Sequence, residues 1–151
     1  MRDEATIRPA TLADVPAVVE VLRASITTLC VEDHHDEPAA LSDWLANKTV
    51  ENVERWLAQP GQHMLVAVRS ETVCGVASVG ASGPVHLCYV LPEHARCGVG
   101  RSLMRGLEAH ARVHGLHRLC LDSTLTAERF YRAMGFESTG NEARSYEKAL
   151  T

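Results

Sequence analysis

Two glycines, Gly98 and Gly100, stand between an apolar segment and a helical pattern, with three arginines close by. A helix that begins here would expose the backbone N–H groups of its first turn, and its dipole adds about half a positive charge. Arg96, Arg101 and Arg105 add guanidinium groups, whose N–H donors fit phosphate oxygens. The glycines could also serve only a tight strand-to-helix turn, but together these residue types indicate a phosphate-bearing ligand.

Two common phosphate motifs do not fit this turn. The Walker loop ends in Gly-Lys-Ser/Thr, whereas this chain reads Gly100-Arg101-Ser102 and lacks the lysine. The dinucleotide fingerprint needs a third glycine, where Leu103 stands, and a parallel βαβ unit, whereas the preceding segments look like a hairpin. We therefore do not expect nucleotide oxidoreduction.

The elements that must position this turn form one continuous pattern without repeats or linkers. Apolar alternation and turn residues predict strands over 4–10, 63–70, 72–81, 85–91, 117–123, 136–140 and 143–150. Apolar spacings of three and four, together with capping residues, predict helices over 12–29, 40–47, 50–57, 98–114 and 126–134. This order predicts a single α/β (α+β) domain over residues 1–151, with a mostly antiparallel sheet and helices on both of its faces.

The strand at 85–91 has two unlike faces. Because side chains alternate along a strand, Leu87 and Tyr89 share one face, whereas His86 and Cys88 share the other. The second face carries the more reactive groups.

Composition excludes several classes of protein. The chain has 151 residues, of which 46% are hydrophobic and 23% charged, and this length suits one core. A net charge of -4 argues against nucleic-acid binding. No apolar run approaches the ~20 residues that span a membrane, and the N-terminal residues lack a secretory pattern, so we expect a cytoplasmic protein. The five cysteines form no CxxC pair, so we expect neither disulfides nor a metal site.

Three short motifs at compatible spacing resemble the GCN5-related N-acetyltransferase (GNAT) family. The glycine turn Ala95–Gly100 is similar to the family signature Arg/Gln-x-x-Gly-x-Gly/Ala. Upstream, Tyr89–Glu93 resembles the family's V-x-P-E strand end, and downstream Phe130–Phe136 resembles its F-Y-x-x-x-G-F. The resemblance implies acetyl-CoA as the donor and a sheet that is splayed around the acetyl-CoA slot.

The resemblance also implies the residues that hold the donor. Backbone groups of Tyr89, Val90 and Leu91 would pair with the pantetheine. The diphosphate group of the ligand would be held by Arg96, Cys97, Gly98, Val99, Gly100, Arg101 and Ser102. Two residues depart from the family pattern: Ala95 replaces the usual Arg or Gln, and Thr124 stands where many members have an asparagine near the pantetheine.

Acetyl transfer to an amine needs a deprotonated nitrogen, stabilisation of the oxyanion and a proton for the leaving thiolate. Tyr131 resembles the family tyrosine that donates to the departing sulfur, although it could also be a core aromatic. His86 aligns with a histidine that aralkylamine acetyltransferases use as general base. Alternatively, His86 is a structural residue and the proton leaves through water. Glu93 is a further candidate for the base. Cys88 could in principle carry the acetyl group, but a buried cysteine is usually inert.

The acceptor end depends on the segment 31–37, in which four of seven residues are acidic. In the family this segment lies over the acceptor groove, so we expect Asp33, His34 and Trp44 to contribute to a pocket for a small amine. A solvated loop is the alternative. Adjacent His34 and His35 lack the spacing of a helical metal site.

The resulting prediction is an acetyl-CoA-dependent N-acetyltransferase. Its acceptor would be the primary amine of a small amine, an amino acid or a peptide N-terminus, attacked directly in a ternary complex without a metal. The alternative is a noncatalytic acyl-CoA-binding or regulatory module, which would need neither Tyr131 nor His86. The C-terminal hairpin, together with the frequent dimers of the family, makes a homodimer possible.

Overall fold

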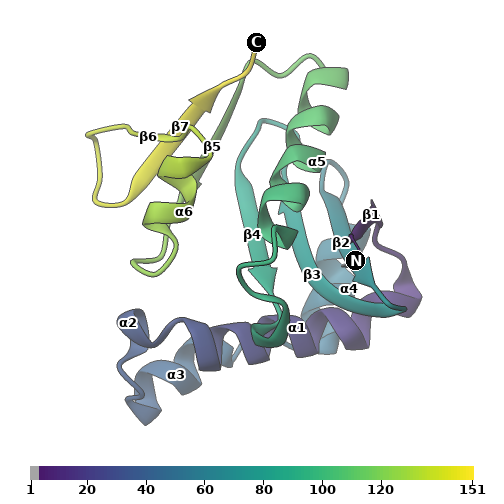
Figure 1. Cartoon of the computed structure of the whole chain (residues 1–151), viewed down its shortest axis with the longest axis vertical. Helices are drawn as coiled ribbons and strands as arrows, with labels where there is room; N and C mark the ends of the chain where they lie inside the picture. Colours follow the sequence, from purple (N-terminus) through teal and green to yellow (C-terminus); the bar gives the residue numbers. More distant parts are fainter. Residues whose placement is uncertain (1–3) are drawn as a thin grey trace.

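The strands form two sheets in the computed structural model, which describes residues 4–151 (Figure 1). The first sheet is antiparallel, with the order β1 (Thr6–Pro9), β2 (His63–Arg69), β3 (Thr72–Val79) and β4 (Val85–Val90). The second is also antiparallel, with the order β5 (Arg118–Asp122), β7 (Ser145–Ala149) and β6 (Glu137–Ser138). Each strand lies within a segment for which the sequence predicted one.

The helices also follow the predicted segments, with one addition. They are α1 (Val15–Leu29), α2 (Val31–His34), α3 (Pro38–Leu45), α4 (Val50–Ala58), α5 (Val99–Val113) and α6 (Glu128–Ala133), with short 3-10 turns at Leu12–Asp14 and Pro92–His94. The helical turn α2 was not predicted, because its four residues are polar at most positions. The Thr49 hydroxyl accepts a hydrogen bond from the Asn52 N–H at 3.2 Å, as expected of a helix N-cap.

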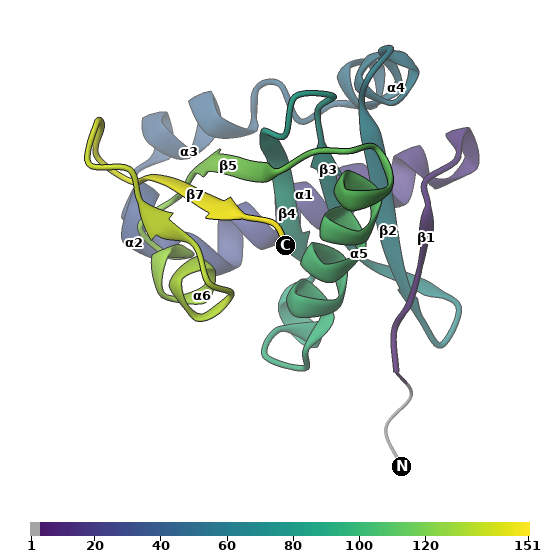
Figure 2. The same cartoon turned by 90° about the horizontal axis from the view of Figure 1, so that it is seen from above.

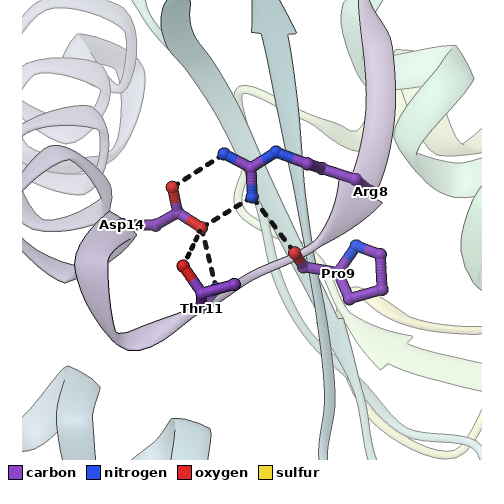
Figure 3. Close-up of polar contacts among 4 residues, drawn as sticks. All are labelled: Arg8, Pro9, Thr11 and Asp14. Atoms are coloured by element: carbon purple, nitrogen blue, oxygen red, sulfur yellow. Dashed lines mark hydrogen bonds and ion pairs between the residues drawn. The ribbon is translucent and has the colours of Figure 1, made fainter.

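An ion pair fixes the entry to α1. Figure 3 shows Arg8 of β1 donating two hydrogen bonds of 2.8 Å to the Asp14 carboxylate. The Thr11 N–H also donates to this carboxylate at 2.7 Å. These hydrogen bonds, above all those from Arg8, lower the pKa of Asp14 to about 2. The end of β1 and the start of α1 are therefore joined by a charged contact.

Helices cover both faces of the four-stranded sheet, with α5 on one face and α1 on the other (Figure 2). Gly75 of β3 allows α5 to approach, because a Cβ there would lie 3.0 Å or less from side-chain atoms of Val99 and Leu103. The buried stripe of α1 packs on the opposite face and includes Val18 and Leu22. The core lies between these layers, as predicted from the two apolar stripes.

The two sheets meet at a parallel bridge between Pro84 and Cys120. Next to it the Cys120 N–H donates to the Gly83 carbonyl at 3.0 Å. Gly83 has φ +106°, and a Cβ there would lie 2.4 Å from the Arg118 carbonyl oxygen, so only glycine allows this approach. From the bridge, β4 and β5 diverge (Figure 1). This arrangement confirms the predicted fold class, including the splayed sheet.

Candidate active site

A cleft of about 640 Å³ occupies the space between the diverging strands. Its walls come from the end of α1, the whole of β4, the turn into α5, the end of β5 and the start of α6. The splay therefore brings the glycine turn, the reactive strand and the aromatic helix to one cavity.

The cleft has two sides, which the register of β4 defines. Gly75, which faces α5, pairs with Val90, and Ala77 on the same face pairs with Cys88. Cys88 and Val90 therefore point to the side of α5 and α6, whereas Leu87 and Tyr89 point to the side of α1. From Leu87 to Val90 this is the alternation that the sequence predicted, whereas a register shift interrupts it at His86.

The backbone of β4 is oriented differently from the expectation. The Leu91 N–H donates to the Cys74 carbonyl of β3 at 2.8 Å, and the Leu91 carbonyl accepts from His94 at 2.9 Å. Because backbone groups alternate in direction along a strand, Tyr89 also faces β3. The strand therefore presents the N–H and C=O groups of Cys88 and Val90 to the cleft, in place of those of Tyr89 and Leu91.

The glycine turn presents backbone donors. Gly98 precedes α5 with φ +85°, and Arg96 also adopts a positive φ of 61°. The first intrahelical bond is donated by the Ser102 N–H to the Gly98 carbonyl at 3.0 Å. The Ser102 N–H is therefore already used, and the unpaired donors of the first turn belong to Val99, Gly100 and Arg101.

Gly100 lies against the aromatic helix. A Cβ at this position would be 3.3 Å from Cζ of Phe130 and 3.9 Å from a methyl group of Val90. Gly100 and Phe130 both line the cleft. Any larger side chain here would enter the cleft or displace the Phe130 ring.

Tyr131 is buried, with 7% of its surface exposed, and it lines the cleft together with Cys88. Burial is the main reason that the pKa of Tyr131 lies well above 10, and the neighbouring Cys88 and Tyr89 raise it further. Burial likewise raises the pKa of Cys88 to about 12. At neutral pH both groups keep their protons, so Tyr131 is a donor and Cys88 is a weak nucleophile.

His86 occupies an irregularity in β4. Ser78 pairs with Leu87 and the next residue, Val79, pairs with Val85, so His86 is an extra residue without a partner on β3. Such bulges re-aim a side chain and are common beside active sites. His86 is exposed and lines the cleft near the bridge between the sheets.

Two of the predicted acceptor residues, Asp33 and His34, support the wall of the cleft. The Asp33 carboxylate accepts the Leu125 N–H at 2.7 Å and two hydrogen bonds from Thr126. His34 is 1% exposed, and its ring nitrogens contact the Ile26 carbonyl at 2.9 Å and the Asp36 N–H at 3.0 Å. Neither side chain lines the cleft.

Trp44, the third predicted acceptor residue, packs edge-on against His34, with 6.2 Å between ring centroids. Burial is the main reason that the pKa of Tyr89 is raised. The Trp44 side chain also interacts with Tyr89, which slightly offsets the rise in the pKa of that tyrosine. Trp44 does not line the cleft, whereas Tyr89 does.

The cleft contains many but not all of the predicted residues. Those that line it are His86, Tyr89, Val90, Arg96, Gly98, Gly100, Arg101, Thr124 and Tyr131. Leu91, Cys97, Val99 and Ser102 flank these positions without lining it. Thr124 also stabilises the turn before α6, because its hydroxyl accepts a hydrogen bond from the Ala127 N–H at 3.1 Å.

Sequence reasoning missed the contribution of α1 and of the end of β5. Ser25, Leu29 and Cys30 line the cleft from α1, and Asp122 lines it from β5. Ser25 carried a detectable signal, because it is the polar residue in an otherwise apolar buried stripe. Asp122 carried none beyond its position at the end of a strand.

Residues 4–151 contain neither a metal-binding cluster nor a membrane-spanning helix. Across this range no group of three or more His, Cys, Asp or Glu side chains could hold a metal ion. None of the helices in the described part is long and apolar enough to cross a membrane.

The sequence matches a family described as "Acetyltransferase (GNAT) domain" over residues 30–147. A curated relative, an IAA acetyltransferase from Azospirillum brasilense, is 35% identical over 92 residues, which cover 56% of this chain and 60% of the relative. An uncharacterized acetyltransferase from Streptococcus pyogenes serotype M1 is 36% identical over 50 residues, covering 33% of this chain and 35% of the relative. The matched segments thus span about a third to three fifths of these relatives.

Solved structures share the fold over nearly the whole chain. A GCN5-related N-acetyltransferase from Rhodopseudomonas palustris has a TM-score of 0.87 and 22% identity, covering 99% of this chain and 98% of that one. PaiA N-acetyltransferase from Thermoplasma acidophilum, solved with coenzyme A, has a TM-score of 0.82 and 17% identity, with coverage of 96% and 98%.

A further structure is more similar in sequence. It is a putative acetyltransferase from Salmonella typhimurium, solved with its cofactor acetyl-CoA, with 26% identity, a TM-score of 0.65 and coverage of 97% and 94%. The family match covers far more than half of the chain and agrees with the splayed sheet and the glycine turn. This chain therefore belongs to the GNAT family of acetyltransferases.

Proposed function

We propose that the protein transfers the acetyl group of acetyl-CoA to a primary amine by direct attack in a ternary complex. The observation that supports this most is the cleft, in which a helix N-terminus with unpaired N–H groups and a buried tyrosine hydroxyl line one cavity. The protein would act through a single GNAT domain over residues 1–151.

The donor would lie along β4 with its diphosphate at α5. Free N–H groups of Val99, Gly100 and Arg101 would hold the phosphate oxygens, with the exposed guanidinium of Arg96 adding charge. The outward backbone groups of Cys88 and Val90 would pair with the amides of the pantetheine. Ala95 has no polar side chain, so backbone groups carry more of this binding than in the family pattern.

The reaction forms a bond between nitrogen and the acetyl carbon and breaks the bond between that carbon and sulfur. The amine must first lose a proton, which His86 at the bulge would accept directly or through water. The sulfur leaves with its electron pair and would receive the proton of Tyr131. The proton that nitrogen still carries after the attack passes to the Tyr131 oxygen directly or through water, and His86 releases its proton to solvent. The net reaction gives an amide, a thiol and a proton.

A noncatalytic acyl-CoA-binding module is the competing function. It would require the phosphate-binding turn, but not a buried tyrosine whose hydroxyl is held beside Cys88. Because desolvation of a tyrosine hydroxyl is unfavourable, its presence in the cleft favours the enzyme. The acceptor could be a small amine, an amino acid or a peptide N-terminus.

An assay of thiol release from acetyl-CoA tests this proposal. The purified chain is incubated with alkylamines, polyamines, amino acids, aminoglycosides and short peptides, with a thiol reagent as readout. We expect release above the hydrolysis background with at least one amine and an acetylated product of matching mass. Tight binding of CoA without transfer to any amine would support the binding module instead.

A further inference from the structure

Ser25 is a buried hydroxyl whose role the fold does not explain. It lies on α1 with 3% of its surface exposed, and it lines the cleft beside Leu29 and Cys30. Among residues 4–151, no hydrogen-bond partner of its side chain is found. In this part of the chain, every polar side-chain atom that is fully shielded from solvent has a hydrogen-bond partner. The Ser25 oxygen has no partner, so it is not fully shielded and must open into the cleft. A hydroxyl that opens into the cleft without a protein partner is free to form a hydrogen bond with a ligand bound there.

Asp122 brings a charge to the same side of the cleft. Leu119 and Leu121 are buried, and Leu121 pairs with Tyr146, whose hydroxyl donates to Glu128 of α6. Side chains alternate along β5, so Asp122 points away from α6, toward the side of α1. That side also receives Leu87 and Tyr89 from β4.

The register places Asp122 level with the bulge. The sheets are bridged at Pro84 and Cys120, so Asp122 lies two residues beyond the bridge on β5, as His86 does on β4. The phosphate-binding turn begins more than four residues further along β4, which is roughly 13 Å away.

Charges in the cleft are therefore separated along its length. Arg96 and Arg101 line the end at α5, whereas Asp122 lines the end near the bridge. On the Asp122 face of β5, Arg118 is paired with Glu147 at 3.2 Å, and among residues 4–151 no ion pair with Asp122 is found. The carboxylate of Asp122 thus remains available to a positively charged ligand.

We propose that Ser25 and Asp122 bind the acceptor and make the enzyme selective for small cationic amines. Asp122 draws the ammonium form to the end of the cleft opposite the diphosphate, and the Ser25 hydroxyl accepts one of its N–H groups. The nitrogen is then held level with His86, where it loses a proton before attack. This inference rests on the proposed function, because it assigns the acceptor side of that same cleft.

Two probes of equal length separate charge from shape. Butylamine is a cation at neutral pH, whereas O-propylhydroxylamine is neutral and still has a terminal NH₂ group. Thiol release is measured with both for the wild type, Ser25→Ala and Asp122→Asn. The control variants Thr28→Ala and Asp43→Asn make the same chemical changes at exposed positions outside the cleft.

We expect Asp122→Asn to raise the KM for butylamine by about tenfold and to leave that for O-propylhydroxylamine within about twofold. Ser25→Ala should raise the KM for both probes by a similar factor. The KM for acetyl-CoA should stay unchanged in both variants. A general distortion of the cleft would instead raise the KM for acetyl-CoA as well. Unchanged KM values for both amines, or an equal rise for acetyl-CoA, would overturn the inference.

A binding measurement separates this inference from the proposed function. Calorimetry follows butylamine added to the CoA-saturated protein, with no turnover required. If no amine is acetylated but butylamine binds and Asp122→Asn weakens that binding by about tenfold, the proposed function fails, while the cleft still has a cation-binding site at Asp122. Acetylation of other amines together with an absence of butylamine binding to the wild type would refute the inference alone.

Discussion

The Asp33 carboxylate accepts the hydroxyl of Thr126 at 2.6 Å, which joins α2 to the segment that leads into α6. The two residues are 93 positions apart in the chain. α6 begins at Glu128 and carries Tyr131, so this contact helps to place the tyrosine beside the cleft. An acidic residue that the sequence suggested for acceptor binding thus stabilises the wall of the cleft.

Asp33→Ala should lower both stability and turnover. Three hydrogen bonds to a charged group are lost, which corresponds to roughly 1–3 kcal/mol in the free energy of unfolding. We expect a lower Tm and a lower kcat, because α6 loses its anchor. Asp36→Ala is the control, since Asp36 is exposed. A normal Tm combined with a raised KM for cationic acceptors would instead favour direct binding by Asp33.

Tyr131→Phe should lower kcat by about tenfold or more, on the order of 1.4 kcal/mol, with little change in CoA affinity. The phenyl ring preserves the packing, but the proton donor to the leaving sulfur is lost. Tyr146→Phe removes a hydroxyl that donates to Glu128 outside the cleft, and it should affect stability more than turnover. Unchanged turnover in Tyr131→Phe would remove this residue from the mechanism.

Gly100→Leu should abolish measurable CoA binding while the fold remains intact. The new side chain meets the Phe130 ring, because even a Cβ would lie 3.3 Å from it. Calorimetric titration with CoA measures the binding, and circular dichroism measures the fold. Gly115→Leu is a matched control at the other end of α5, where φ is +74° and no atom lies within 4 Å. It should reduce stability by about 1 kcal/mol and leave CoA binding unchanged.

Asp14→Asn should reduce stability at neutral pH by about 2 kcal/mol. The folded pKa of Asp14 is about 2, below its ordinary 3.8, so its contribution is present above pH 3.8 and is lost as the pH falls through 2. Urea denaturation from neutral pH to about pH 3 should show the difference between wild type and variant narrowing below pH 4. A difference that does not depend on pH would mean that packing, rather than charge, links Asp14 to Arg8.

A stack of three histidines should make the protein less stable in mild acid. The ring centroids of His63 and His110 lie 3.6 Å apart, and those of His110 and His114 lie 4.1 Å apart. Burial, followed by the neighbouring histidines, lowers the pKa values of His63 and His110 below 6.5. The unfolded chain therefore takes up protons first, and stability falls as the pH drops below about 6.5.

The variant His63→Gln tests this dependence, with the exposed His117→Gln as control. We expect a smaller loss of Tm between about pH 7.5 and pH 5.5 for His63→Gln than for the control. Proton NMR of the ring signals should give titration midpoints below the ordinary value for both His63 and His110. Identical pH profiles in the two variants would show that the stack does not titrate in this range.

Local pattern predicted most of the fold and the turn that carries the predicted donor-binding glycines. Gly98, Gly100 and Arg101 lie within four positions of one turn. They are close in space because they are close in the chain. Alternation along β4 predicted the opposite orientations of Cys88 and Tyr89, and the register confirms them. Such short-range regularities need no knowledge of tertiary contacts.

The other walls of the cleft were harder to predict because they depend on contacts that are distant in sequence. Asp33 is satisfied by backbone groups more than 90 residues away, and nothing near it in the chain indicates this. The direction of the backbone groups at Leu91 depends on its pairing with β3. His86 has no partner on β3 because Ser78 pairs with Leu87 and the next residue, Val79, pairs with Val85. Periodicity alone does not encode any of these relationships.

The divergence of β4 and β5 has a consequence for the self-association of the protein. Two adjacent strands turn unpaired backbone edges toward each other across the cleft, and such edges readily recruit strands from other molecules. A bound pantetheine chain, with its own amide groups, would pair with one of these edges as a short extra strand does. Preparations saturated with CoA should therefore resist self-association on heating. The donor would then protect the exposed strand edge as well as supply the acetyl group.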